Sequence, residues 1–142
     1  MLRERCYRMQ YRKLGKTGFE VSEISLGTWQ LGGTWGLDFD EKTAENVLAA
    51  SVENGVNFFD TADVYNDGQS EIAIGKFLKK YKDRIYVATK AGRKLNPHEA
   101  AGYTPANIQN FIEDSLKRLQ LDCLDLLQLH CPPTAQPTHT HP

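Results

Sequence analysis

The most informative feature of the sequence is a set of three apolar, strand-like segments, each followed by a side chain that can carry charge or exchange a proton. The segments are residues 57–59, 85–89 and 124–129. The first leads into Asp60, with Tyr65 five positions later, the second into Lys90 and the third into His130. Because α/β barrels keep their active sites at the carboxyl ends of their strands, we expect these four side chains to lie at one rim.

The chemistry of these four groups suits the protonation of a carbonyl oxygen. A phenol ordinarily has a pKa of ~10, and a lysine ammonium within hydrogen-bond reach stabilises the phenolate and lowers that pKa. A buried lysine needs a counter-charge, which Asp60 could supply. The imidazole of His130 could donate to a carbonyl oxygen and orient it. Reduction of that carbonyl would still need an electron pair, for which a nicotinamide hydride is the natural source.

Each residue taken alone also has an ordinary structural interpretation. Asp60 could cap a loop, and Tyr65 could be a core or surface aromatic residue. Lys90 could end a solvated strand, and His130 could be a simple strand terminus. Their joint placement at strand ends is what favours a catalytic site. Cys131 does not pair with His130 in this interpretation, because adjacent side chains on a strand point apart.

The spacing of apolar and turn residues predicts the elements that position this site. Two short alternating runs around a glycine-bearing turn, within residues 9–21, predict a β-hairpin. Strands are expected to begin near residues 24, 57, 85 and 124, with helices beginning near residues 40, 70 and 104. This alternation predicts a parallel sheet. A flavodoxin-like or Rossmann sheet would alternate too, but no G-x-G-x-x-G motif follows the first strand.

Helix boundaries can be predicted from capping residues. Asp40 and Thr104 are expected N-caps, and Gly55 is an expected C′ glycine. The second helix is expected to carry its cationic residues in its last turns; these are Lys79, Lys80, Lys82 and Arg84. The loop of residues 93–103 is too long to be a mere connector.

Composition excludes several classes of protein. The 142 residues are 40% apolar and 25% charged, with a net charge of −1, so we expect no nucleic-acid or membrane partner. No apolar run approaches the ~18 residues that span a bilayer. The three cysteines form no C-x-x-C motif and are expected to be free thiols in a reducing cytosol, which predicts a cytoplasmic protein. His139 and His141 are interpreted as tail residues, and no metal site is predicted.

Four runs of the sequence resemble aldo/keto reductases, in the branch shared by bacterial and plant reductases and potassium-channel β-subunits. They are G-K-T-G-F-E-V-S-E-I-S-L-G-T-W, F-F-D-T-A-D-V-Y-N-D-G-Q-S-E, A-T-K-A-G and L-D-L-L-Q-L-H. The resemblance implies a (β/α)8 TIM barrel with an N-terminal hairpin, and NADPH-dependent (NADP) reduction of aldehydes or ketones to alcohols, with a small carbonyl compound as substrate. It places the family's catalytic tetrad on Asp60, Tyr65, Lys90 and His130.

The same resemblance implies positions for ligands. Cofactor contacts fall on Gly27, Thr28, Trp29 and Asp60. Trp35 falls in the same loop as Thr28 and Trp29. The resemblance places Trp35, Tyr65 and His130 near the substrate.

A complete barrel of this kind needs eight strands and about 250 residues, whereas four strands and three helices are expected here. Residues 9–134 would therefore be the N-terminal half of a barrel, preceded by an extension (1–8) and followed by an irregular Pro/Thr/His tail (135–142). Such a chain looks truncated, is expected to be inactive alone, and is expected to self-associate through its open edges. The alternatives are a non-catalytic half-barrel or redox-sensing binding partner, and a β/α enzyme with a Schiff-base lysine.

Overall fold

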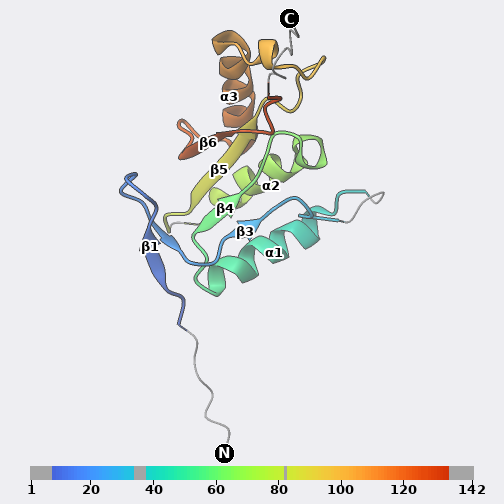
Figure 1. The fold of residues 1–142 in the computed structure, drawn as a ribbon. Coiled ribbons are helices and arrows are strands. Elements are labelled where there is room, and N and C mark those ends of the chain that lie inside the picture. Colours follow the sequence, from blue (N-terminus) through green and yellow to red (C-terminus); the bar gives the residue numbers. More distant parts are fainter. Residues whose placement is uncertain (1–7, 34–37, 82, 135–142) are drawn as a thin grey trace, which may run out of the picture.

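The computed structural model describes residues 8–33, 38–81 and 83–134. In chain order the elements are β1 (Tyr11–Lys13), β2 (Glu20–Ser22), β3 (Leu26–Gly27), α1 (Glu41–Glu53), β4 (Phe58–Asp60), the 3-10 turn η1 (Tyr65–Gly68), α2 (Gln69–Leu78), β5 (Tyr86–Ala91), the 3-10 turn η2 (Ala100–Gly102), α3 (Pro105–Leu119) and β6 (Leu126–Leu129). Strands β1 and β2 form an antiparallel hairpin, and β3 to β6 form a parallel sheet in that order (Figure 1). The predicted hairpin, four parallel strands and three helices are thus confirmed.

The register of the parallel sheet sets which side chains share a face. Asp60 pairs with Gly27 on one side and with Ala88 on the other. Because side chains alternate along a strand, Lys90 lies on the same face as Ala88 and hence as Asp60. Phe59 and Val87 point to the opposite face, into the apolar core.

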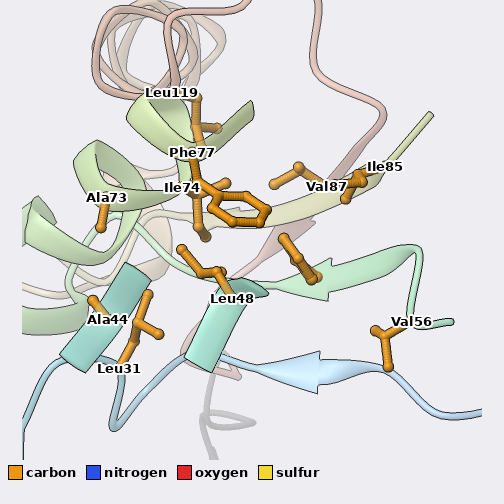
Figure 2. Close-up of a cluster of buried hydrophobic side chains, with 11 residues drawn as sticks. Leu31, Ala44, Leu48, Val56, Ala73, Ile74, Phe77, Ile85, Val87 and Leu119 are labelled. Carbon is orange, nitrogen blue, oxygen red and sulfur yellow. The ribbon is translucent and has the colours of Figure 1, made fainter. Parts of the chain in front are cut away.

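That core fills the space between the sheet and the three helices. Figure 2 shows Leu48 of α1, Ile74 of α2 and Leu119 of α3 in one cluster with Val87 of the sheet. All four are almost completely buried. The helices therefore cover one face of the sheet, and the face that carries Asp60 and Lys90 is left for other groups.

Two of the predicted helices have the predicted caps. Asp40 accepts a hydrogen bond from the Lys42 amide at 2.9 Å, and Thr104 caps α3 by accepting one from the Asn107 amide. Gly55 has φ = +88°, the left-handed conformation expected of the glycine that follows a helix.

The predicted end of α2 is wrong. The helix stops at Leu78, so Lys79, Lys80 and Arg84 follow it instead of forming its last turns; Lys82 lies outside the described residues. The reason is that Tyr81 stacks on Phe77 at 4.2 Å between ring centroids from a turn beyond the helix, which extends the apolar spacing past the helix itself. Strand limits also differ by one or two residues: β3 begins at Leu26, β6 begins at Leu126, and Lys90 lies inside β5.

The hairpin covers the amino ends of the strands, opposite the rim that carries Asp60. Phe19 stacks on Tyr86 with 4.6 Å between ring centroids. The Ser22 amide donates to Oδ1 of Asn57 at 2.7 Å, which ties the end of β2 to the start of β4. Within the described part of the chain, β3 and β6 each pair on one side only, and no helix is long and apolar enough to cross a membrane.

Candidate active site

The structure brings all four predicted catalytic side chains to one edge of the sheet. Asp60 is the last residue of β4, Lys90 is the penultimate residue of β5, and His130 directly follows β6. Tyr65 begins the 3-10 turn that leads from β4 into α2. The prediction of a shared rim is therefore matched by the geometry.

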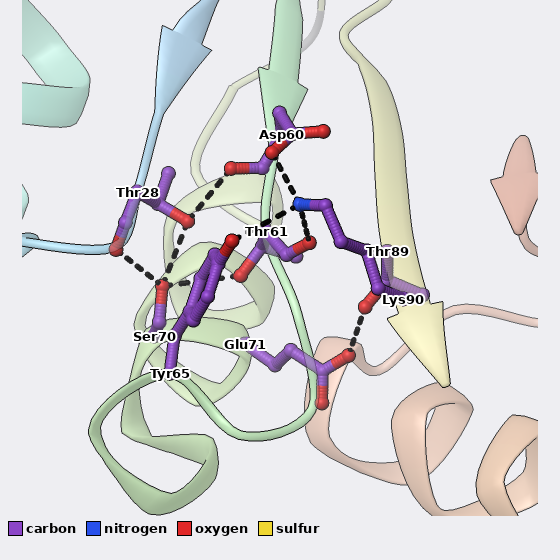
Figure 3. Close-up of polar contacts among 8 residues, drawn as sticks. All are labelled: Thr28, Asp60, Thr61, Tyr65, Ser70, Glu71, Thr89 and Lys90. Carbon is purple, nitrogen blue, oxygen red and sulfur yellow. Dashed lines mark hydrogen bonds and ion pairs between the residues drawn. The ribbon is translucent and has the colours of Figure 1, made fainter. Parts of the chain in front are cut away.

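Lys90 is the centre of this group (Figure 3). Its ammonium Nζ forms an ion pair with Asp60 and donates to the Thr61 carbonyl at 2.9 Å. It also donates to the phenol oxygen of Tyr65 at 3.2 Å. The lysine side chain is only 14% exposed, so it is a largely buried cation whose three N–H groups all have an acceptor.

The direction of the Lys90–Tyr65 hydrogen bond has a chemical consequence. Because the ammonium can only donate, the phenol oxygen of Tyr65 accepts. The phenol's own proton is therefore available to a further acceptor. A phenol polarised by a cation and with its proton directed elsewhere is arranged as a proton donor.

His130 lies against the ring of Tyr65. The two rings meet edge to face, with 5.9 Å between centroids. Burial lowers the pKa of His130 from its usual value, and the positive charges of Lys90 and Arg93 lower it further. The imidazole is consequently neutral at neutral pH, and a neutral imidazole carries one N–H that can be donated to a substrate oxygen.

A buried hydroxyl network that sequence reasoning missed lies directly beneath the site. Ser70, at the start of α2, donates to Oγ1 of Thr28 at 2.9 Å and lies 3.1 Å from Oγ1 of Thr61. Thr28 in turn donates to the Asp60 carbonyl at 3.0 Å. All three hydroxyl residues are completely buried. The network fixes the backbone of residues 60 and 61, the segment that supplies two acceptors to Lys90 (Figure 3).

A second buried contact joins the same layer to α3. Glu71 is fully buried, accepts from Thr89 at 2.5 Å and pairs with Arg118 at 2.6 Å. Its partners lie on β5 and α3, so it links three elements. A signal for both networks existed in the polar run after β4, but serine and glutamate at a helix start read equally well as ordinary capping residues.

Asp63 is a further buried acid, for which sequence analysis predicts no role. Both its carboxylate oxygens are buried and have no hydrogen-bond partner among the described residues. Burial, followed by the nearby negative charge of Glu71, raises the pKa of Asp63 to about 6, although Lys94 and Arg118 oppose the shift.

The end of β3 and the loop that follows it, which we call the first loop, hold most of the residues expected to contact a cofactor. A Cβ on Gly27 would meet no atom within 4 Å, so the backbone there borders open space. The Trp29 side chain is 53% exposed. Thr28 is completely buried, with its hydroxyl inside the network; its contact with a cofactor stays a prediction. Trp35 lies outside the described residues.

Within the described ranges, no group of three or more His, Cys, Asp or Glu side chains could hold a metal ion. Cys123 and Cys131 are free thiols there. Cys6, His139 and His141 lie outside the described residues.

A parallel β/α sheet with a tyrosine, lysine, aspartate and histidine gathered at its strand ends is consistent with the β/α-barrel class, in which active sites lie at the carboxyl ends of the strands. Comparison with known sequences agrees with this class. The sequence model of the aldo/keto reductase family matches residues 23–140, and the chain belongs to that family.

Individual relatives support the assignment. The chain is 41% identical to the aldo-keto reductase YhdN of Bacillus subtilis over 127 residues, which are 87% of this chain and 38% of that protein. It is 35% identical to a probable voltage-gated potassium channel subunit beta of Arabidopsis thaliana, over 91% of this chain and 39% of that one. The chain therefore spans about two fifths of the length of these relatives.

Solved structures lead to the same family. The holo form of aldo-keto reductase AKR11C1 from Bacillus halodurans matches with a TM-score of 0.71 and 35% identity, over 86% of this chain and 40% of that one. An aldo-keto reductase from Klebsiella pneumoniae in complex with NADPH matches with a TM-score of 0.70 and 27% identity, over 89% and 41%. The sheet β3 to β6 is thus part of a (β/α)8 barrel fold.

Proposed function

We propose that this chain supplies the acid–base half of an NADPH-dependent reductase of aldehydes or ketones. The observation that carries the proposal is the position of Lys90, whose ammonium contacts both Asp60 and the phenol oxygen of Tyr65. This arrangement donates a proton to a carbonyl oxygen. The nicotinamide cofactor, when bound, would supply the hydride that the protein's own side chains cannot.

Each residue has one task in the proposed reaction. Tyr65 gives its proton to the oxygen of the carbonyl group as negative charge develops there. The ammonium of Lys90 stabilises the charge left on the phenol oxygen, and Asp60 keeps that ammonium charged in a largely buried position. Neutral His130, edge-on to the phenol, donates an N–H to the same substrate oxygen and orients it.

The first loop is suited to a flat ring. Gly27 leaves the backbone open at the carboxyl end of β3, and Trp29, two residues later, is partly exposed. Absence of a side chain allows close backbone approach to a ligand. The site face of the sheet also carries Asp60, whose side chain is one third exposed. These residues fit a nicotinamide better than a metal, because the donors nearby are amides, an indole and one carboxylate already paired with lysine.

A Schiff-base role for Lys90 is disfavoured by the same contacts. Such a lysine attacks a carbonyl carbon as the neutral amine. Here all three N–H groups donate to fixed acceptors, one of which is a carboxylate, and this arrangement stabilises the ammonium.

The function can be tested by completing the barrel. Residues 9–134 would be fused to the carboxyl-terminal part of YhdN that lies beyond the matched region; we call this the fused protein. We expect it to oxidise NADPH in the presence of an aromatic aldehyde. A folded fused protein that binds NADPH but reduces no aldehyde or ketone would contradict the proposed function.

Replacement of Lys90 by methionine should remove most of this activity. The substitution keeps an unbranched side chain, one heavy atom shorter, but removes the cation next to the phenol oxygen. We expect the rate of carbonyl reduction to fall by about a hundredfold or more, and the pH dependence of the remaining activity to change. Steady-state rates across pH check this. A pH–rate profile in Lys90→Met that matches the unchanged fused protein would show that the two groups are not coupled.

The raised pKa of Asp63 predicts a pH dependence of stability. A folded-state pKa of about 6 against an ordinary value of 3.8 gives stability that is present below about pH 4 and is lost as pH rises through about 6. Relative to Asp63→Asn, the fused protein should lose up to about 3 kcal/mol of unfolding free energy between about pH 4 and pH 7. Urea unfolding measures this difference, with Asp67→Asn as a control because the Asp67 side chain is 97% exposed. Parallel stability curves for Asp63→Asn and the unchanged protein would refute it.

A further inference from the structure

The loop between β5 and α3 contains a tyrosine that the proposed mechanism does not use. Tyr103 follows the 3-10 turn η2, and its hydroxyl donates to the backbone carbonyl of His130 at 3.0 Å. His130 itself donates its amide to the Ala91 carbonyl at 2.8 Å. The backbone of His130 is therefore held from both sides just after β6 ends.

The ring of Tyr103 also contacts the strand that carries Lys90. Gly92, one residue past the end of β5, has φ = +106°, and a Cβ built there would lie 2.3 Å from the Tyr103 ring. Only glycine allows the ring to lie this close to the backbone. Tyr103 thus spans the ends of β5 and β6, the two strands that deliver Lys90 and His130 to the site.

A histidine fixes the direction of the tyrosine's proton. Nε2 of His98 lies 2.8 Å from the phenol oxygen of Tyr103. A phenol has one proton, and a carbonyl oxygen can only accept, so the proton of Tyr103 points to His130 and Nε2 of His98 donates. Burial raises the pKa of Tyr103, which keeps the phenol protonated and able to donate at neutral pH.

We propose that Tyr103 is a positioning residue, which clamps the end of β6 against the end of β5 and thereby holds the His130 imidazole edge-on to Tyr65. It acts through the His130 backbone and has no contact with the reacting atoms. The catalytic consequence rests on the proposed function, but the clamp itself does not. A displacement of the imidazole by about 1 Å is enough to reduce a rate about a hundredfold.

The matched pair of substitutions is Tyr103→Phe and Tyr11→Phe. Each removes a hydroxyl that donates to a distant backbone carbonyl, but Tyr11 donates to Gly55 at the opposite end of the sheet, at 2.8 Å. Tyr103→Phe keeps the ring against Gly92. A difference between the two variants therefore reports the place of the hydrogen bond and not the loss of a hydroxyl in general.

The first measurement uses the fused protein, in which β6 is expected to have a neighbouring strand on both sides, and needs no activity. Amide hydrogen exchange, followed by mass spectrometry on peptides covering residues 124–131, reports opening of the end of β6. We expect exchange there to become about three- to tenfold faster in Tyr103→Phe, the change that loss of one hydrogen bond produces. Exchange should be unchanged there in Tyr11→Phe. Unchanged exchange in Tyr103→Phe would overturn the clamp.

The second measurement also uses the fused protein. We expect kcat to fall about ten- to a hundredfold in Tyr103→Phe, while the NADPH dissociation constant and the KM of the aldehyde change little. Faster exchange with an unchanged kcat would overturn the positioning role. If the fused protein without these substitutions reduces no carbonyl compound, the proposed function has failed, and the exchange data alone decide whether Tyr103 holds His130.

Discussion

Tyr65→Phe is expected to abolish carbonyl reduction by the fused protein and to leave NADPH binding nearly intact. The substitution removes one oxygen atom and leaves the ring edge-on to His130. Without the phenol, the proposed general acid is lost, and kcat should fall by about a hundredfold to ten-thousandfold. The cofactor does not depend on the phenol for binding, so its dissociation constant should change by less than about twofold.

The measurement is steady-state turnover of an aldehyde together with a fluorescence titration of NADPH, with Tyr11→Phe as the control. The Tyr11 hydroxyl also donates a hydrogen bond, but to Gly55, far from the site. That variant should keep its turnover. Comparable turnover in Tyr65→Phe at neutral pH would remove Tyr65 from the role of acid, and a parallel loss of NADPH affinity would indicate a structural role instead.

The common placement of the four proposed catalytic residues could be predicted from sequence because each of them follows an apolar strand segment. Parallel strands deliver their carboxyl ends to one edge, so linear spacing is enough to place Asp60, Lys90 and His130 together. Tyr65 follows Asp60 closely enough to stay at the same edge. The spacing does not predict the side-chain contacts. Lys90 donates hydrogen bonds to Asp60, Thr61 and Tyr65 at once, and this depends on rotamers that only the folded chain fixes.

The supporting residues could not be predicted in the same way. Asp60 and Asp63 both follow β4, yet one forms an ion pair and the other is buried without a partner; sequence spacing does not distinguish them. Tyr103 lies in a loop with no apolar period, so nothing in its neighbourhood indicates that its hydroxyl reaches His130, 27 residues away. Long-range side chain–backbone hydrogen bonds of this kind become visible only in three dimensions.

The other prediction with a large expected effect concerns the activity and oligomeric state of the 142-residue polypeptide when it is expressed alone. We expect it to reduce no carbonyl compound detectably and to self-associate. Strands β3 and β6 each have an unpaired edge among the described residues, whereas a closed barrel has none. Leu129 at the end of β6 is 54% exposed, and parallel strands are stable only when both faces are covered.

Hydride transfer adds a second requirement that the polypeptide alone is not expected to meet. The reacting atoms must be held within about 3–3.5 Å of each other, which requires the cofactor to be fixed along its length. The described residues offer Gly27 and Trp29 at one end of the sheet. The chain spans about two fifths of its relatives, so the fused protein is expected to bind NADPH far more tightly than the polypeptide alone.

Size-exclusion chromatography and an NADPH titration of both proteins test this expectation. The polypeptide alone should elute as an oligomer with no measurable turnover, and the fused protein as a soluble species with both binding and turnover. A charged substitution on the open edge offers a sharper test. Leu129→Lys should shift the polypeptide toward the monomer, because a lysine on an edge strand opposes pairing. The control is Val47→Lys on the exposed side of α1, which should not change the oligomeric state. A monomeric polypeptide that unfolds cooperatively, binds NADPH with micromolar affinity and turns over an aldehyde would show that these four strands suffice.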